Sequence, residues 1–276
     1  MESLIRSFVN EVAAPNSGRG VARWRDRLCV GTANLKPEAA QYIVDRVSTV
    51  AEDLGLSPEG PGCKPHIIII ATNDGEAVAR QLVQERGRAF RMGGGGMDRG
   101  GVALRDFLET PRPVRWWQLS MPVDAENGQI ATRIPGQCTE SCSDTYEYAP
   151  ILDIFAASRL STQIVDDIFR AVVIVDMDEM TNVTLAQLAD YIAMVTLAQI
   201  LPNADTSSYA SILNLFDAPA STDGLTEWDR AYLEGLYDTV RTRKNPGAGR
   251  LEVAASIGRT HQRLQNEAAA GDDGKD

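Results

Sequence analysis

The sequence "LAQLADYIAMVTLAQIL", residues 185–201, is the longest helix-sized apolar segment of the chain. It carries a single charged side chain, that of Asp190, and apolar residues cover most of its helical circumference. A helix that is apolar nearly all round is buried in the middle of a domain. We therefore predict a buried central helix over 184–200.

Polar side chains occupy one side of this helix. Gln187, Asp190, Tyr191 and Met194 follow the i, i+3, i+4, i+7 spacing, which places them on one face. A buried polar side chain needs a hydrogen-bond partner or a cleft to face. We predict a ligand-binding surface at Gln187, Asp190 and Tyr191, near the loop that holds Gly93–Gly96. The alternative is that Asp190 and Tyr191 form a purely structural buried pair.

The helix lacks the donor pair of a zinc metallopeptidase. In that class of enzyme two histidines lie four residues apart, so that both imidazoles share one face. Here the corresponding pairs are Asp190 with Met194 and Val195 with Gln199. The chain also has no G-x-S-x-G nucleophile elbow and no glycine-rich loop that ends in Gly-Lys-Ser/Thr. The sequence therefore favours a protein that is not an enzyme, with no catalytic residue, no metal ligand and no cofactor.

The segment "AVVIVDMDEMT", residues 171–181, carries the strongest competing signal. It resembles the first motif of haloacid-dehalogenase-type phosphotransferases, which implies Asp176 as nucleophile and Asp178 as general acid. Met180 stands where that family has threonine or valine, and carboxylates at a strand exit are more often solvated turn residues. The alternative function is a hydrolase, either metal-dependent through Asp176, Asp178 and Asp190 or a degenerate zincin-like enzyme with non-standard ligands.

Apolar runs and turn residues predict the remaining elements. The β-branched run "IIIIAT" after His66 is typical of a strand buried on both faces, and "FRAVVIVD" (169–176) is a second such run. Together the segments predict an α+β fold whose small mixed sheet packs on two helices. The predicted strands lie near 28–32, 66–72, 114–120 and 169–176, and the helices span 36–54 and 184–200. We expect a core domain over 1–206, a helical C-terminal portion over 207–268 packed on it, and a disordered tail over 269–276.

The four cysteines bear on the compartment. An even number of cysteines outside apolar helix faces is typical of disulfides in an exported protein. Cys29 and Cys63 come within disulfide distance if their segments are sheet neighbours, and Cys138 with Cys142 would close a small loop. Reduced thiols or a metal site are the alternatives. The prediction is a periplasmic or secreted protein whose signal peptide is not part of this sequence.

Charge limits the classes of partner. The formal net charge of −11 argues against non-specific binding to nucleic acid or to an anionic membrane. No apolar run approaches the ~20 residues that span a bilayer. Arginines are concentrated between Arg80 and Arg115, where a solvated face paired with acids and a site for an anionic polymer are both open interpretations.

The runs "FRAVVIVDMDEM", "LAQLADYIAMVTLAQILPNADTSSYASILNLFD" and "LTEWDRAYLEGLYD" also carry a resemblance to known proteins. They are similar to a bacterial family of exported proteins, a domain of unknown function whose members include lipoproteins. The resemblance is strongest over 158–238 and extends more weakly to the segments around Cys29 and Cys63. It implies a degenerate zincin-like core and a periplasmic location, without a known reaction.

Overall fold

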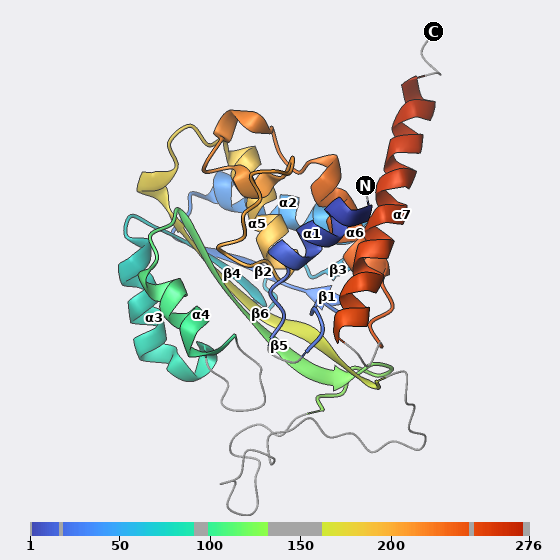
Figure 1. Cartoon of the computed structure of the whole chain (residues 1–276). Helices are drawn as coiled ribbons and strands as arrows, with labels where there is room; N and C mark the ends of the chain where they lie inside the picture. The colour runs from blue at the N-terminus through green and yellow to red at the C-terminus, as the bar shows by residue number, and fades with distance from the viewer. Residues whose placement is uncertain (1, 17–18, 91–98, 132–161, 243–245, 273–276) are drawn as a thin grey trace, which may run out of the picture.

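The computed structural model describes residues 2–16, 19–90, 99–131, 162–242 and 246–272 (Figure 1). Its centre is a four-stranded mixed sheet in the order β2–β4–β6–β5. Strands β2 (Val30–Ala33), β4 (Ile67–Thr72) and β6 (Ile164–Asp176) run parallel, and β5 (Val114–Asp124) is antiparallel to β6. A short parallel pair joins β1 (Arg27–Leu28) to β3 (Ser57–Pro58). The predicted α+β class and the small mixed sheet are confirmed.

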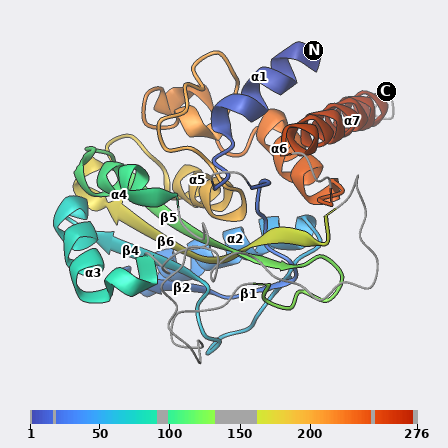
Figure 2. The same ribbon diagram turned by 60° about the horizontal axis from the view of Figure 1, so that its bottom comes forward.

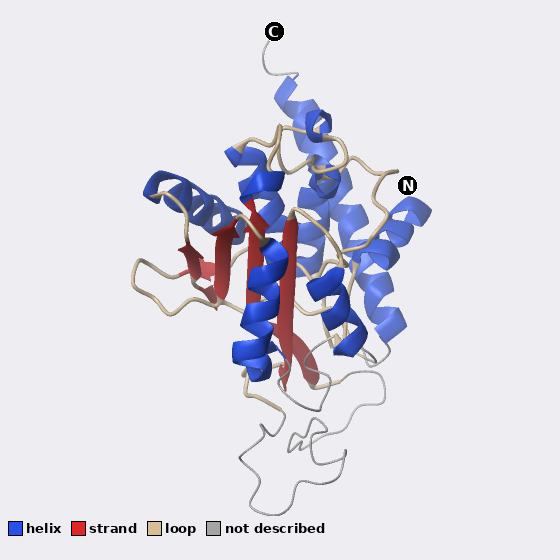
Figure 3. Ribbon diagram, turned by 90° about the vertical axis from the view of Figure 1, so that its left-hand side faces the viewer, coloured by secondary structure: helices blue, strands red, loops and turns tan. Residues whose placement is uncertain are grey.

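Helices cover both faces of the sheet, as Figure 3 shows. On one face, α3 (Gly75–Phe90) and α4 (Gly100–Glu109) form a thin layer. On the other, α2 (Pro37–Asp53) and α5 (Leu185–Leu197) pack directly on the strands. Beyond them lie α1 (Glu2–Val12), α6 (Glu227–Asp238) and α7 (Pro246–Asp272). No helix among the described residues is both long and apolar enough to cross a membrane.

The middle position of β6 explains its apolar sequence. Successive side chains of a strand point to opposite faces of the sheet. Val173 and Val175 pack into the large core beneath α2 and α5, while Val172 and Ile174 pack against α3 and α4. Because both faces are covered, the strand has no position in this stretch that favours a polar side chain.

The first helix of the chain packs with the last two in one helical layer. Figure 2 shows α1 beside α6 and α7, and the Phe8 ring lies 4.8–5.5 Å, centroid to centroid, from the rings of Tyr209, Trp228 and Tyr232. The predicted division at residue 206 assigned α1 to the core domain, but its buried face packs with the C-terminal helices in one shared hydrophobic cluster. Helix α7 runs to Asp272, and residues 273–276 lie outside the described part, so the disorder expected over 269–276 stays a prediction.

Helix α5 ends at Leu197, three residues before the predicted boundary. Ala198 has extended backbone, and Ile200 pairs with Ala13 in an isolated β-bridge. Side chains from other elements satisfy the last carbonyls of the helix: Trp24 Nε1 donates to Thr196 O at 2.8 Å. Further donors are Gln118 to Val195 O and Ala198 O, and Tyr237 to Leu197 O. These partners end the helix, and none of them is near it in sequence.

Replacing Gly235 with alanine is expected to destabilise the protein by about 2 kcal/mol, as overpacking of a close contact does. Gly235 lies on α6 where α7 crosses it, and a Cβ there would lie 2.6 Å from the Cα and the amide nitrogen of Ile257. Because these are backbone atoms, the whole of α7 has to move. Urea denaturation of the variant measures the loss.

Gly249→Ala is the matched control, since Gly249 lies on α7 with open space at its Cβ position. Alanine favours a helix over glycine by about 0.5–1 kcal/mol, so this variant is expected to be slightly more stable. A Gly235→Ala protein as stable as the Gly249→Ala protein would contradict the close α6–α7 approach.

Candidate functional site

Gln187 is used by the fold itself. It closes a capping box at the start of α5, in which its Oε1 accepts a hydrogen bond from Thr184 N at 2.9 Å. Its Nε2 donates to Pro219 O at 2.8 Å and to Thr222 O at 2.7 Å. The side chain is 5% exposed and ties α5 to the loop that precedes α6. The predicted ligand contact at Gln187 is therefore occupied by backbone carbonyls.

Asp190 is a buried anchor between three elements. Its Oδ1 accepts a hydrogen bond from Arg46 Nε on α2, and its Oδ2 accepts one from Leu225 N at 2.8 Å. Gly224 passes so close to the carboxylate that any side chain there would collide with it. The hydrogen bond to Asp190 raises the pKa of Arg46, so this guanidinium stays charged. This arrangement is the structural alternative considered for Asp190, although its partner is Arg46 and not Tyr191.

Tyr191 faces another direction. Its ring lies 4.9 Å from the Phe216 ring and 6.1 Å from the Trp116 ring, both nearly perpendicular to it. Burial raises the pKa of the phenol well above its ordinary value, so the hydroxyl is neutral and able to donate a hydrogen bond. Tyr191 lines a cavity that the other two predicted site residues, Gln187 and Asp190, do not line.

This cavity, which we call the Tyr191 pocket, has a volume of about 400 Å³. It lies between the start of β5, helix α5 and the loop 202–217. Its inner wall is aromatic and its mouth is polar. The wall consists of Trp116, Tyr191 and Phe216, and the polar lining includes Thr110, Arg112, Asn203, Asp205, Thr206, Ser207, Asn214 and Asp217.

An ion pair holds one side of the mouth in place. Arg112 Nη2 lies 3.1 Å from both carboxylate oxygens of Asp106 and donates to Asn203 Oδ1 at 2.7 Å. Burial raises the pKa of Asp106, but hydrogen bonds from Thr110, Asn203 and Arg112 outweigh burial and lower it. Because the pKa is lowered in the folded state, the pair persists as the pH falls through the ordinary carboxyl range, and its stabilisation is lost only below it.

The loop on the other side is held by Asn214. Its Nδ2 donates to Thr206 O at 3.0 Å and to Tyr209 O at 2.8 Å, and its Oδ1 accepts from Thr206 Oγ1 at 2.6 Å. Side-chain bonds to a backbone turn of this kind fix the conformation of the loop. The pocket is thus formed before any ligand arrives, which lowers the entropy lost on binding.

The carboxyl ends of the parallel strands carry a separate polar cluster. Asp176 Oδ2 accepts from Gly75 N at 2.8 Å, at the first residue of α3, and Asn73 Nδ2 donates to Asp178 Oδ1 at 2.6 Å. The Asp176 carboxylate occupies the place that a phosphate would take at a helix N-terminus. Asp190 is bound to Arg46 instead, so the three carboxylates of the alternative hydrolase do not share one site.

Within the described ranges, one group of three potential metal ligands lies close together, namely Cys29, Glu59 and Cys63. The two cysteines form a disulfide with a Cα–Cα distance of 6.0 Å, as predicted, so their sulfur atoms are not free to ligate a metal. His66 Nδ1 accepts a hydrogen bond from Cys29 N at 3.1 Å, which gives this histidine a structural role. The predicted partners Cys138 and Cys142 lie outside the described residues.

Three described arginines between Arg80 and Arg115 lie in different parts of the fold. Arg80 pairs with Glu76 along α3, Arg112 belongs to the Tyr191 pocket, and Arg115 is 4% exposed and donates to the carbonyl of Phe107. Three of the predicted anion-binding side chains are thus bound within the protein. The anionic-polymer partner stays a prediction.

The sequence pattern indicated Tyr191 but not the residues that complete its pocket. Arg112 and Phe216 lie in segments without periodicity, and nothing in their local sequence indicates that they meet. One signal was present in the sequence. Trp116 and Trp117 are adjacent residues of strand β5, so their rings point to opposite faces of the sheet, and Trp116 faces α5. The loop of Gly93–Gly96, predicted to lie near this surface, falls outside the described residues.

No model of a known family, no curated protein and no solved structure matches this chain at a significant level.

Proposed function

We propose that this protein is an exported, non-enzymatic binding protein that acts in the cell envelope and holds its ligand in the Tyr191 pocket. The observation that carries the proposal is the combination of an aromatic wall with a hydrogen-bonded polar mouth around a preformed cavity of about 400 Å³. Ligand pockets are typically of this size and combine apolar walls with a few placed polar groups.

The lining favours a neutral ligand that is rich in hydroxyl groups and has one apolar face, such as a saccharide. The charge of Arg112 is balanced by Asp106, while Asp205 and Asp217 add negative charge at the mouth. An anionic ligand would be repelled there. Amide and hydroxyl groups both donate and accept hydrogen bonds, carboxylates accept them, and the ring faces offer contact to C–H surfaces.

The disulfide supports export. Disulfides persist in oxidising compartments and are rare in the cytosol. The disulfide joins Cys29, just before β2, to Cys63, before β4, and the two residues are separated by 34 positions in the sequence. Periplasmic location, and a lipid anchor of the kind that the family resemblance implies, are part of this proposal.

The chemistry of the lining supports binding over catalysis. Acyl transfer or hydrolysis needs a nucleophile next to a base of suitable pKa. The described lining of the Tyr191 pocket holds hydroxyl groups but neither histidine nor cysteine, and the phenol of Tyr191 is kept neutral by burial. The Asp106 carboxylate, which lies next to the lining residue Arg112, is already paired with it.

Titration with N-acetylglucosamine and glucose, followed by ¹H–¹⁵N NMR, tests the proposal. We expect millimolar or tighter binding of at least one sugar, with the largest shift changes at residues 110–117, 191 and 203–217. Phe216→Leu keeps apolar volume but removes a ring face, and an aromatic contact contributes about 0.5–1.5 kcal/mol, so affinity should fall about twofold to tenfold.

Phe169→Leu is the matched control, because Phe169 is an exposed phenylalanine on β6 outside the pocket, and it should leave affinity unchanged. Equal effects of the two substitutions, or shift changes away from the pocket, would reject the site. Absence of binding by either sugar would reject the proposed ligand class.

A further inference from the structure

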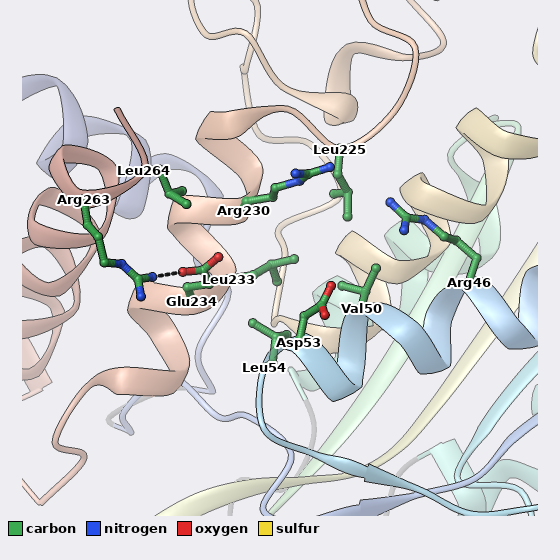
Figure 4. A pocket seen from close by; sticks show the side chains of 10 residues that line it. All are labelled: Arg46, Val50, Asp53, Leu54, Leu225, Arg230, Leu233, Glu234, Arg263 and Leu264. Atoms are coloured by element: carbon green, nitrogen blue, oxygen red, sulfur yellow. Dashed lines mark hydrogen bonds and ion pairs between the residues drawn. The ribbon is translucent and has the colours of Figure 1, made fainter. Parts of the chain in front are cut away.

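A second cavity lies between α2 and the helix pair α6 and α7. Its volume is about 400 Å³, and it is unconnected with the lining of the Tyr191 pocket. We call it the arginine cleft, and Figure 4 shows its side chains. They are Arg46, Val50, Asp53, Leu54, Leu225, Arg230, Leu233, Glu234, Arg263 and Leu264.

The base of the arginine cleft is aliphatic. Val50 and Leu233 are 6% and 1% exposed, and Leu225 is 8% exposed. All three belong to the main hydrophobic cluster, and the partly buried Leu54 and Leu264 extend it toward the mouth. The cleft thus reaches down to the core, and an apolar group that entered it would leave water at a gain of about 25 cal/mol per Å².

Helical spacing puts charged groups above this base. Residues three and four positions apart share one face of a helix. On α2 the cleft side carries Arg46, Val50 and Asp53, and on α6 it carries Arg230, Leu233 and Glu234. Each helix therefore offers the cleft an arginine, an aliphatic side chain and an acid.

Two of the three arginines have partners that hold them in position. Arg46 donates through Nε to the buried Asp190, and Arg263 donates to Glu234. Arg230 is different: within the described residues its guanidinium makes no ion pair, and in Figure 4 it extends from α6 toward Leu225 above the aliphatic base. The cleft thus combines an apolar base with one guanidinium, that of Arg230, whose charge is not neutralised by an ion pair within the described residues.

From this geometry we infer that the arginine cleft binds an aliphatic carboxylate, such as a medium-chain fatty acid. The alkyl chain lies on Val50, Leu225 and Leu233, and the carboxylate accepts hydrogen bonds from Arg230. A guanidinium presents a planar pair of N–H donors that matches a carboxylate, and charge-assisted bonds of this kind are about twice as strong as neutral ones.

The charges of the cleft select the anion over a cation or a neutral alcohol. Glu234 is engaged by Arg263, and Asp190 by Arg46, so neither acid is left to attract an ammonium group. Asp53 lies beside Leu54 at the end of α2, apart from Arg230 in Figure 4. A hydroxyl in place of the carboxylate would lose the charge-assisted bond while keeping the alkyl contact.

Isothermal titration with octanoate, octanol and octylamine tests this assignment on the full chain. Octanoate should bind at least tenfold more tightly than octanol, and octylamine should bind most weakly. Arg230→Ala should weaken octanoate about tenfold, equivalent to about 1.4 kcal/mol, and leave octanol unchanged. Arg230→Lys keeps the charge without the planar fork and should give an intermediate loss.

Arg259→Ala is the control, because Arg259 is an exposed arginine on α7 outside the cleft. It should change octanoate affinity less than twofold. Equal affinity for octanoate and octanol, equal losses in the Arg230 and Arg259 variants, or no octanoate binding would overturn the inference. NMR shifts at residues 46–54 and 225–234 support it, whereas shifts confined to residues 203–217 would place the carboxylate in the Tyr191 pocket and also overturn it.

Discussion

Replacing Asp229 with alanine is expected to lower the free energy of unfolding by about 4 kcal/mol, because each buried donor left without a partner costs about 1–3 kcal/mol. Asp229 is completely buried near the start of α6. Its Oδ1 accepts from Ser211 Oγ at 2.6 Å, and its Oδ2 accepts from Ile212 N at 2.8 Å and from Thr226 N at 3.0 Å. Within the described part of the chain, no other carboxylate accepts hydrogen bonds from Ser211 Oγ, Ile212 N and Thr226 N.

The loss at Asp229 should reach beyond its own helix. The carboxylate caps α6 in a box with Thr226 and also fixes the loop that carries Phe216 of the Tyr191 pocket. We therefore expect Asp229→Ala to weaken sugar binding as well as stability. Urea denaturation at neutral pH gives the stability, with the exposed Asp223→Ala as the control, expected within about 0.5 kcal/mol of the natural protein. A stability loss at Asp229 no larger than at Asp223 would contradict the described hydrogen bonds.

Removing the Cys29–Cys63 disulfide is expected to cost about 4 kcal/mol. The bond closes a loop with a sequence separation of 34 residues, and a cross-link of that length removes conformational entropy from the unfolded chain. It joins Cys29, the residue between β1 and β2, to the segment before β4, so it also holds β2 and β4 in register. Cys63→Ser should lower Tm and the urea midpoint together.

The second cysteine pair has to be separated from this effect. In a background of Cys138→Ser and Cys142→Ser, a thiol reductant should destabilise the protein by the same amount as Cys63→Ser, and should have no further effect on the Cys63→Ser protein. Non-reducing mass spectrometry of protein from its native cell fraction shows whether the bond exists there. Free thiols at Cys29 and Cys63 in that fraction would contradict both the disulfide and the export that it supports.

Local sequence was sufficient to predict an element where its whole apolar segment is buried. The run 169–176 is apolar at every core position because both faces of β6 are covered, so strand and burial follow from the same residues. The central helix was predicted for the same reason, since α5 is buried from Gln187 to Leu197. The cysteine pairing at Cys29 and Cys63 followed from their places beside neighbouring strands.

The predicted element boundaries were wrong where a residue interacts with a partner that is far from it in sequence. Strand β6 begins at Ile164, five residues before the apolar run, although Asp166 and Asp167 interrupt the pattern. Arg19 pairs with Asp166, and Arg25 and Arg241 pair with Asp167, so the two carboxylates continue the strand without unpaired charge. The end of α5 was misplaced for the same reason, because its capping donors come from elsewhere in the chain.

The layers of this protein follow from local sequence patterns, since burial periodicity is a local property that a chain carries wherever it folds. Only the tertiary structure decided its sites. Gln187, Asp190 and Tyr191 share one helical face, but the first two are bound by the fold and the third opens on a pocket. That outcome depends on Arg46, Phe216 and Leu225, which come close to α5 only in the folded chain, so no spacing along the helix can distinguish a ligand contact from an internal one.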